Sequence, residues 1–153
     1  MIKILISLVF IINLTISCGF TPILKDTNNT LVYYEIDPSS SYKARQLFNS
    51  SFINLEKGKA KFVTKVSIIE NESAVNIESS GSVNEYKIEI LINFKIIEIA
   101  TNNIIFESQT RGFANYDVSN SEYTNTLVQK DAIEKALTSG IQLMNIIVQS
   151  KVN

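Results

Sequence analysis

The sequence predicts an α+β fold: a two-layer sandwich in which two helices cover one face of a four-stranded, mostly antiparallel sheet. Three observations lead to it. Apolar residues alternate strictly through residues 86–96, which is the period of a half-buried strand. Between residues 127 and 148 they recur at helical spacing instead. Along the chain the segments follow the order β-α-β-β-β-α, and the apolar side of the central strand needs helices as its cover.

The first strand is expected over residues 31–36, followed by a short helix. The segment LVYYEI is rich in aromatic and branched residues, and Asn-Thr and Asp-Pro bound it. Residues 37–41 supply candidates for the helix N-cap, and Pro38 fits a first helical turn. Gly58 reads as a turn after the helix. The apolar residues at helical spacing are Ala44, Leu47, Phe48, Phe52 and Leu55.

Three further strands are expected in the middle of the chain. The second covers residues 60–70, and the polar segment 70–84 predicts a long connection with some strand within it. The third strand, over 86–96, changes phase at Ile96-Ile97, which predicts a β-bulge there. Thr101-Asn102-Asn103 predicts a hairpin turn, because asparagine tolerates positive φ. The fourth strand follows from Ile104 to about Tyr116, antiparallel to the third.

A long amphipathic helix is expected from a capping box at Ser119 and Glu122 to about Gln149. Gly140 lies on its apolar stripe, where it lowers helix propensity by about 1 kcal/mol but allows close approach to the sheet. The polar side of the helix carries both signs of charge, which favours packing on the sheet over binding along a membrane surface. The stripe consists of Leu127, Ile133, Ala136, Leu137, Ile141, Met144, Ile147 and Val148.

The first eighteen residues predict export and lipidation. Lys3 precedes an apolar run from Ile4 to about Ile12, which is typical of a secretory signal. The run is shorter than the roughly 20 residues that span a bilayer. Leu14-Thr15-Ile16-Ser17-Cys18 then resembles a bacterial lipobox, in which cleavage falls between Ser17 and Cys18. A buried core cysteine after an ordinary signal is the alternative.

Lipidation at Cys18 predicts the organisation of the chain. The signal peptide is expected over residues 1–17, the lipidated N-terminus and tether over 18–30, and one folded domain over 31–153. Cys18 would carry a diacylglycerol and an N-acyl chain, and no other cofactor is expected. It is the one cysteine of the sequence, so no intrachain disulfide forms. Gly19, in a position where Asp commonly retains lipoproteins in the inner membrane, favours the outer membrane.

The composition argues against most enzyme chemistry. The 153 residues include no histidine, which excludes serine–histidine and cysteine–histidine pairs and most zinc sites. No P-loop or nucleophile elbow occurs, and a formal charge of −1 gives no reason to expect nucleic acid. We therefore expect neither catalysis nor a bound metal. A paired-carboxylate hydrolase is the remaining catalytic alternative, with Glu85, Glu89 and Asp117 as candidates.

The uncovered face of the sheet is expected to be polar. It is either a solvated face of weak cross-strand ion pairs or a surface that docks into a polar partner or meets phosphates. Arg111 is the first residue to test, because a guanidinium can hold a phosphate with two hydrogen bonds. The strand phases assign to this face Lys61, Lys65, Lys87, Lys95, Arg111, Glu85, Glu89 and Glu107.

Two stretches and the order of the elements together resemble the lipopolysaccharide-assembly lipoprotein family LptE. The first stretch is the opening Cys18-Gly19-Phe20-Thr21-Pro22-Ile23-Leu24, and the second runs from Gly112 to Ile147. Within the second, the likeness rests on Tyr116-Asp117-Val118, Tyr123, Asp131-Ala132 and Ala136-Leu137. This chain departs from the family at Thr124 and at Gln129-Lys130.

The resemblance implies a non-enzymatic role at the periplasmic face of the outer membrane. Proteins of this family plug the large β-barrel LptD and help to deliver lipopolysaccharide to the cell surface. Basic residues contact lipopolysaccharide in the family, and charge alone selects Lys87, Lys95, Arg111 and Lys130 as candidate contacts with lipopolysaccharide or the barrel. The alternative is an auxiliary lipoprotein of an envelope lipid or solute transporter, or an activator of a periplasmic cell-wall enzyme.

Overall fold

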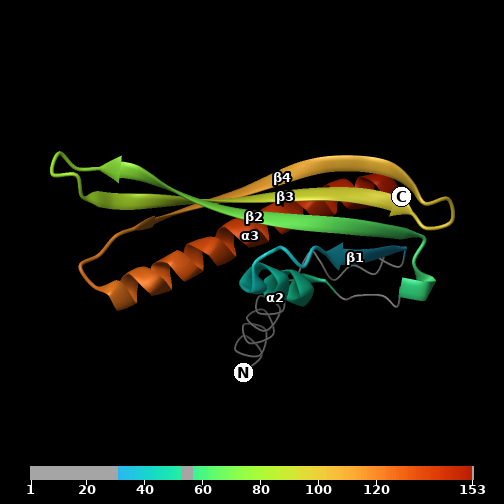
Figure 1. Cartoon of the computed structure of the whole chain (residues 1–153), viewed down its shortest axis with the longest axis horizontal. Helices are drawn as coiled ribbons and strands as arrows, with labels where there is room; N and C mark the ends of the chain where they lie inside the picture. Colours follow the sequence, from blue (N-terminus) through green and yellow to red (C-terminus); the bar gives the residue numbers. More distant parts are fainter. Residues whose placement is uncertain (1–30, 53–56, 153) are drawn as a thin grey trace, which may run out of the picture.

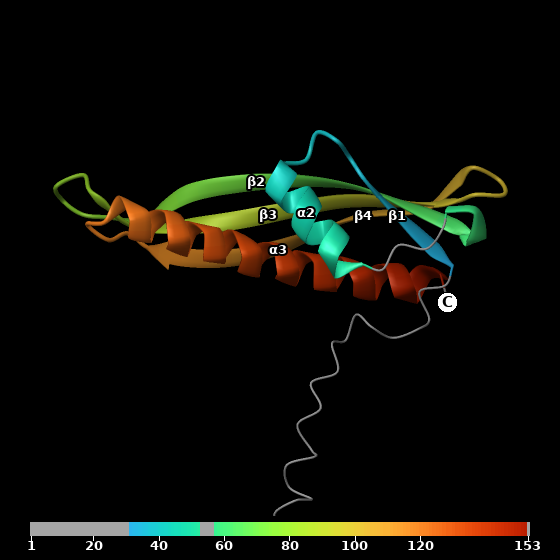
Figure 2. The same cartoon turned by 90° about the horizontal axis from the view of Figure 1, so that it is seen from below.

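A computed structural model describes residues 31–52 and 57–152. Its sheet has the order β1-β2-β3-β4, and helices α2 and α3 lie on the same face of it (Figures 1 and 2). This confirms the predicted two-layer sandwich and its β-α-β-β-β-α order. The predicted signal peptide, the Cys18 lipidation site, the tether and Leu55 lie outside the described residues.

The sheet is mixed because its first strand is parallel to its neighbour and the other pairs are antiparallel. β1 pairs in parallel with β2, while β2, β3 and β4 form an antiparallel meander. Helix α2 lies between β1 and β2 in the chain, and α3 ends the domain. The bounds are β1 Val32–Ile36, α2 Tyr42–Ser51, a single 3-10 turn at Lys57–Lys59, β2 Phe62–Ile77, β3 Val83–Glu98, β4 Asn103–Asp117 and α3 Glu122–Val152.

The core lies between the helices and the even-numbered side chains of β3. These side chains are at most 2 % exposed, as the alternation in the sequence predicts. They are Ile88, Ile90, Ile92, Phe94 and Ile96. From α3 they meet Ala136, Leu137, Ile141, Met144 and Val148, which are equally buried. In the part of the chain that the structure describes, no helix is long and apolar enough to cross a bilayer.

Two glycines allow α3 to cross close to β4. A Cβ built on Gly112 would lie 1.8 Å from the backbone oxygen of Ala136. A Cβ on Gly140 would lie 3.4 Å from the backbone nitrogen of Gly112. At the same crossing, the Thr110 hydroxyl donates a hydrogen bond of 3.1 Å to the backbone oxygen of Gly140. The predicted close approach at Gly140 is therefore confirmed, and Gly112 is its partner on the sheet.

An aromatic cluster holds α2 against the sheet and α3. The ring of Phe48 lies 4.7 Å from that of Phe52 and 6.2 Å from that of Tyr34, measured between centroids. The Tyr34 hydroxyl donates to Oδ1 of Asn145 on α3 at 3.0 Å, and burial raises the pKa of this phenol. The same three rings thus connect β1, α2 and, through the hydroxyl, α3.

The start of each helix differs from the prediction. Pro38 lies outside α2, because Asp37 accepts a hydrogen bond from the Ser39 backbone and forms a turn there. Ser41, the last of the predicted N-cap candidates, is the N-cap, and its hydroxyl oxygen accepts from the nitrogen of Ala44. For α3, Ser121 rather than Ser119 accepts from the first turn, at the nitrogen of Thr124. The helix ends at Val152, three residues beyond the expected Gln149.

The expected long connection at 70–84 is wrong in most of its length. β2 continues to Ile77 and pairs with β3 throughout, so that only residues 78–82 form the turn. Gly81 adopts a φ of 88° in this turn. Residues 71–77 are exposed, so burial imposes no apolar alternation on them. Their polar sequence therefore does not predict a strand.

The second hairpin forms as the sequence predicts. Asn102 adopts a φ of 56° in the turn between β3 and β4. The register shifts at Ile96/Ile97, which confirms the predicted bulge. The extra residue lies on β4, however, because Ile96 pairs with Phe106 and Ile97 with Ile104, leaving Ile105 unpaired.

Candidate functional site

The face of the sheet away from the helices carries mostly polar and charged side chains, as predicted, with Ile69, Leu91 and Phe113 among them. Strand register places the odd-numbered residues of β3 on it, beside odd-numbered residues of β2 and β4. Three of the four candidate contacts, Lys87, Lys95 and Arg111, lie on this face. Lys130 does not: it lies on α3, on the other side of the sheet, and its backbone oxygen accepts from the Nζ of Lys43. The structure therefore separates Lys130 from the other three.

Two of these candidates already have partners within the domain. The Nζ of Lys87 lies 4.2 Å from the centre of the Phe113 ring. The Nη1 of Arg111 lies 3.6 Å from Oε1 of Glu89, and its Nη2 donates to Oε1 of Gln109. Since these contacts balance part of each charge, Arg111 is a weaker phosphate ligand than its side-chain chemistry alone indicates.

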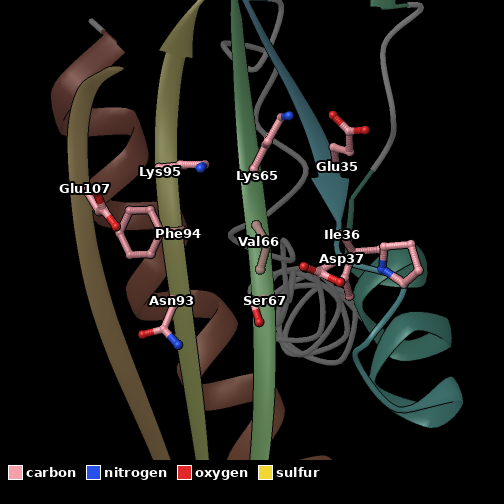
Figure 3. A pocket seen from close by; sticks show the side chains of 11 residues that line it. Glu35, Ile36, Asp37, Lys65, Val66, Ser67, Asn93, Phe94, Lys95 and Glu107 are labelled. Carbon is pink, nitrogen blue, oxygen red and sulfur yellow. The ribbon is translucent and has the colours of Figure 1, made fainter. Parts of the chain in front are cut away.

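A row of four charged residues crosses all four strands at the end of this face where β1 pairs with β2. Glu35 on β1 lies opposite Lys65 on β2, Lys65 lies opposite Lys95 on β3, and Lys95 lies opposite Glu107 on β4. Figure 3 shows these side chains pointing out from the sheet on the same side. The row places two ammonium groups side by side between two carboxylates.

The two central lysines of this row carry like charges at directly opposed positions. No salt bridge within 4.0 Å joins Lys65 or Lys95 to an acid of the described residues. Side chains directly opposite on antiparallel strands have Cβ atoms about 4.5–5.5 Å apart, and like charges in that position are destabilising. The fold itself gains nothing from this pair. An anion placed between the two ammonium groups would remove the repulsion.

The lysine pair borders a shallow depression of about 430 Å³, which the turn after β1 closes on one side. Ser67 and Asn93 also line it and supply a hydroxyl and an amide. Asn93 Oδ1 accepts from Gln109 Nε2 at 2.7 Å, which fixes its amide. Hydrogen bonds from Ser39 lower the pKa of Asp37, another lining residue. Glu35 and Glu107 line it as well, so carboxylates surround the two lysines.

We refer to Lys65, Lys95, Ser67 and Asn93 as the lysine-pair site. Of these residues, the sequence selected Lys95 as a candidate contact and placed Lys65 on the same face without selecting it. The signal that could have found Lys65 is the antiparallel pairing of β2 with β3, since only the register puts the two lysines opposite each other.

Replacing Lys95 by glutamine should change the free energy of unfolding by less than about 0.3 kcal/mol, measured as the urea midpoint. The change removes the repulsion from Lys65 and, at the same time, the attraction to Glu107 on the other neighbouring strand. Lys87→Gln is the matched control on the same strand and face. It removes the cation–π contact with Phe113 and should lower the free energy of unfolding by about 0.5 kcal/mol. A loss of stability in both variants would contradict the proposed repulsion.

The carboxylates considered for a hydrolase are spread along β3 and β4. Glu85 lies opposite Asp117 near one end of the pair and accepts from Nδ2 of Asn115 at 2.8 Å. Glu89 pairs with Arg111 instead. Within the described ranges, no group of three or more Asp, Glu, Cys or His side chains could hold a metal ion.

Comparison with solved structures shows the fold in several lipoproteins. A Caulobacter crescentus protein described as a lipoprotein superposes with a TM-score of 0.59 at 13 % identity, covering 78 % of this chain and 88 % of that one. Rare lipoprotein B of Shewanella oneidensis has a TM-score of 0.54 at 11 % identity, with 78 % and 92 % covered. A minor lipoprotein of Acinetobacter baumannii has 0.57 at 13 %, with 75 % and 87 % covered. No family model and no curated protein matches the sequence. The chain thus shares its fold with lipoproteins.

Proposed function

We propose that this protein is an outer-membrane lipoprotein that plugs an LptD-like β-barrel and helps it to assemble lipopolysaccharide at the cell surface. Lipid on Cys18 would hold the domain at the periplasmic face, and the domain would act without catalysis. The resemblance of Gly112–Ile147 to LptE and the fold shared with lipoproteins, one of them rare lipoprotein B, support the proposal.

The observation that carries the proposal is the uncovered polar face of the sheet. The lumen of a wide outer-membrane barrel is lined by polar side chains, so a domain inserted into it needs a polar surface. The face described above offers mixed charges over three long strands. Its lysine-pair site would meet the phosphates of lipopolysaccharide, which are anions of suitable charge for two ammonium groups.

Lipid anchoring is tested by Cys18→Ala in cells that carry the barrel. We expect an affinity-tagged wild-type protein to co-purify with the barrel from the outer-membrane fraction, and the Cys18→Ala protein to lose that association. If the wild-type protein instead captures a transporter or a cell-wall enzyme and no barrel, the assembly role is wrong.

The lysine-pair site is tested in the same cells by Lys65→Gln combined with Lys95→Gln. The barrel should still co-purify, while lipopolysaccharide bound to the purified protein falls several-fold. The control is Lys130→Gln, on the opposite side of the sheet, which should leave lipopolysaccharide binding unchanged. Equal loss in both proteins would mean that net charge, not this site, binds the ligand.

Neutralising Glu85, Glu89 and Asp117 together should preserve function if the protein is no enzyme.

A further inference from the structure

Among the described residues, no strand pairs with half of the outer edge of β2. β1 pairs with Phe62–Val66 and no further, although β2 continues to Ile77. Figure 1 shows β1 beside one half of β2. The chain that follows β1 extends this pairing by two contacts. The nitrogen of Asp37 donates to the oxygen of Val66 at 2.7 Å, and that of Ile68 donates to the Ser40 hydroxyl at 3.1 Å.

Beyond Ile68 the outward backbone groups of this edge form no hydrogen bond with another described residue. Alternate residues of a strand direct their N–H and C=O groups to the same side. The groups of Glu70, Glu72 and Ala74 therefore point away from β3, as those of Val66 and Ile68 do. No described residue accepts a hydrogen bond from the N–H groups of these three. A register shift after Ala74 ends the regular edge. Because the N–H of Ile68 already donates to Ser40, the open edge runs from the carbonyl of Ile68 to Ala74, about 20 Å at 3.3 Å per residue.

This edge carries acidic side chains but neither lysine nor proline, the two residues that most often block pairing with another strand. Natural edges are commonly protected by lysine or proline, and residues 67–82 contain neither. Their charged residues are all acidic: Glu70, Glu72 and Glu78. Apolar side chains lie among them, with Ile69 44 % exposed and Val75 50 % exposed. The other edge strand, β4, carries both Glu107 and Arg111 and so does not select one sign of charge.

We propose that residues 68–74 bind an extended segment of a partner protein by β-strand addition, and that this segment alternates apolar residues with lysine or arginine. Main-chain hydrogen bonds would come from Glu70, Glu72 and Ala74, and the negative edge supplies complementary charge. The Glu72 carboxylate keeps its charge although its Oε1 accepts from the Tyr116 hydroxyl and from Nε2 of Gln129. A second copy of this chain fits poorly, because antiparallel self-pairing would put glutamates opposite each other. The inference is independent of the barrel role, since it needs no lipopolysaccharide and no lipid anchor.

The test uses the full-length lipoprotein in detergent micelles and the synthetic peptide Lys-Val-Thr-Val-Lys-Val-Thr as probe. We expect saturable binding that slows hydrogen exchange at the amides of Glu70, Glu72 and Ala74 at least tenfold. Ala74→Pro removes one outward N–H without touching the ladder to β3, and should raise the Kd at least tenfold. Ala74→Val keeps that N–H and should bind as the wild type does.

Two further probes keep the test decisive. The peptide with Glu in place of Lys should bind at least tenfold more weakly. A peptide N-methylated at alternate residues should not bind, and it replaces Ala74→Pro if that variant fails to fold. The proposal is overturned if the basic peptide does not bind at millimolar concentration, if N-methylation leaves the Kd unchanged, or if the protected amides lie on β4.

Discussion

Replacing Gly112 by alanine should lower the free energy of unfolding by about 3 kcal/mol, at the upper end of what overpacking commonly costs. The new Cβ would lie 1.8 Å from the backbone oxygen of Ala136. Backbone cannot rotate away as a side chain can, so α3 must move off β4 along the crossing. The measurement is the urea midpoint of the described domain, monitored by circular dichroism.

Gly58→Ala is the matched control for this prediction. Nothing lies within 4 Å of a Cβ built there, so the change should stay within about 0.5 kcal/mol of wild type. Trimming the helix by Ala136→Gly should not rescue Gly112→Ala, because the obstructing atom belongs to the backbone. Wild-type stability of Gly112→Ala would mean that the helix does not cross the strand at this point.

Phe48→Ala should cost about 3–4 kcal/mol, in the range for deleting a buried aromatic ring. Phe48 is 1 % exposed and contacts both Tyr34 and Phe52. Its removal leaves a cavity between α2 and the rest of the core, and α2 has only ten residues, too few to remain helical without packing. Chemical denaturation measures the loss, and hydrogen exchange should show α2 amides losing protection first.

Tyr42→Ala provides the comparison within the same helix. Tyr42 is 75 % exposed, and its truncation should change the free energy of unfolding by less than about 0.5 kcal/mol. If the two substitutions cost the same, the aromatic cluster does not hold α2 in place.

The parts of the fold that burial determines could be predicted from the sequence. The alternation through 86–96 and the helical stripe after Leu127 exist because one side of each element is apolar and covered. Residues 71–77 form a strand without being buried on either face, so apolar and polar side chains do not alternate along them with a period of two. Ser119 and Ser121 are equally good caps by composition, and only the local hydrogen bonds distinguish them.

The sequence predicts which face of the sheet carries the candidate site, but not which side chains lie next to each other on it. A period of two places Lys95 and Arg111 on the uncovered side of the sheet. The opposition of Lys65 and Lys95 requires the register between strands about thirty residues apart, which single-strand patterns do not contain. Whether a charge is already balanced, as for Arg111 by Glu89, depends on side-chain contacts across strands. Charge alone selects Lys130, but this residue lies on α3, on the opposite face of the sheet.

Covering a sheet on one side alone divides its positions into two classes with different evolutionary freedom. Along β3, every second residue fills the interior, and exchange there is limited to apolar residues of similar volume. The residues between them have no interior to fill and can drift or specialise. Sequences that share little beyond the alternation itself can therefore form this architecture, as the lipoproteins with the same fold at 11–13 % identity illustrate.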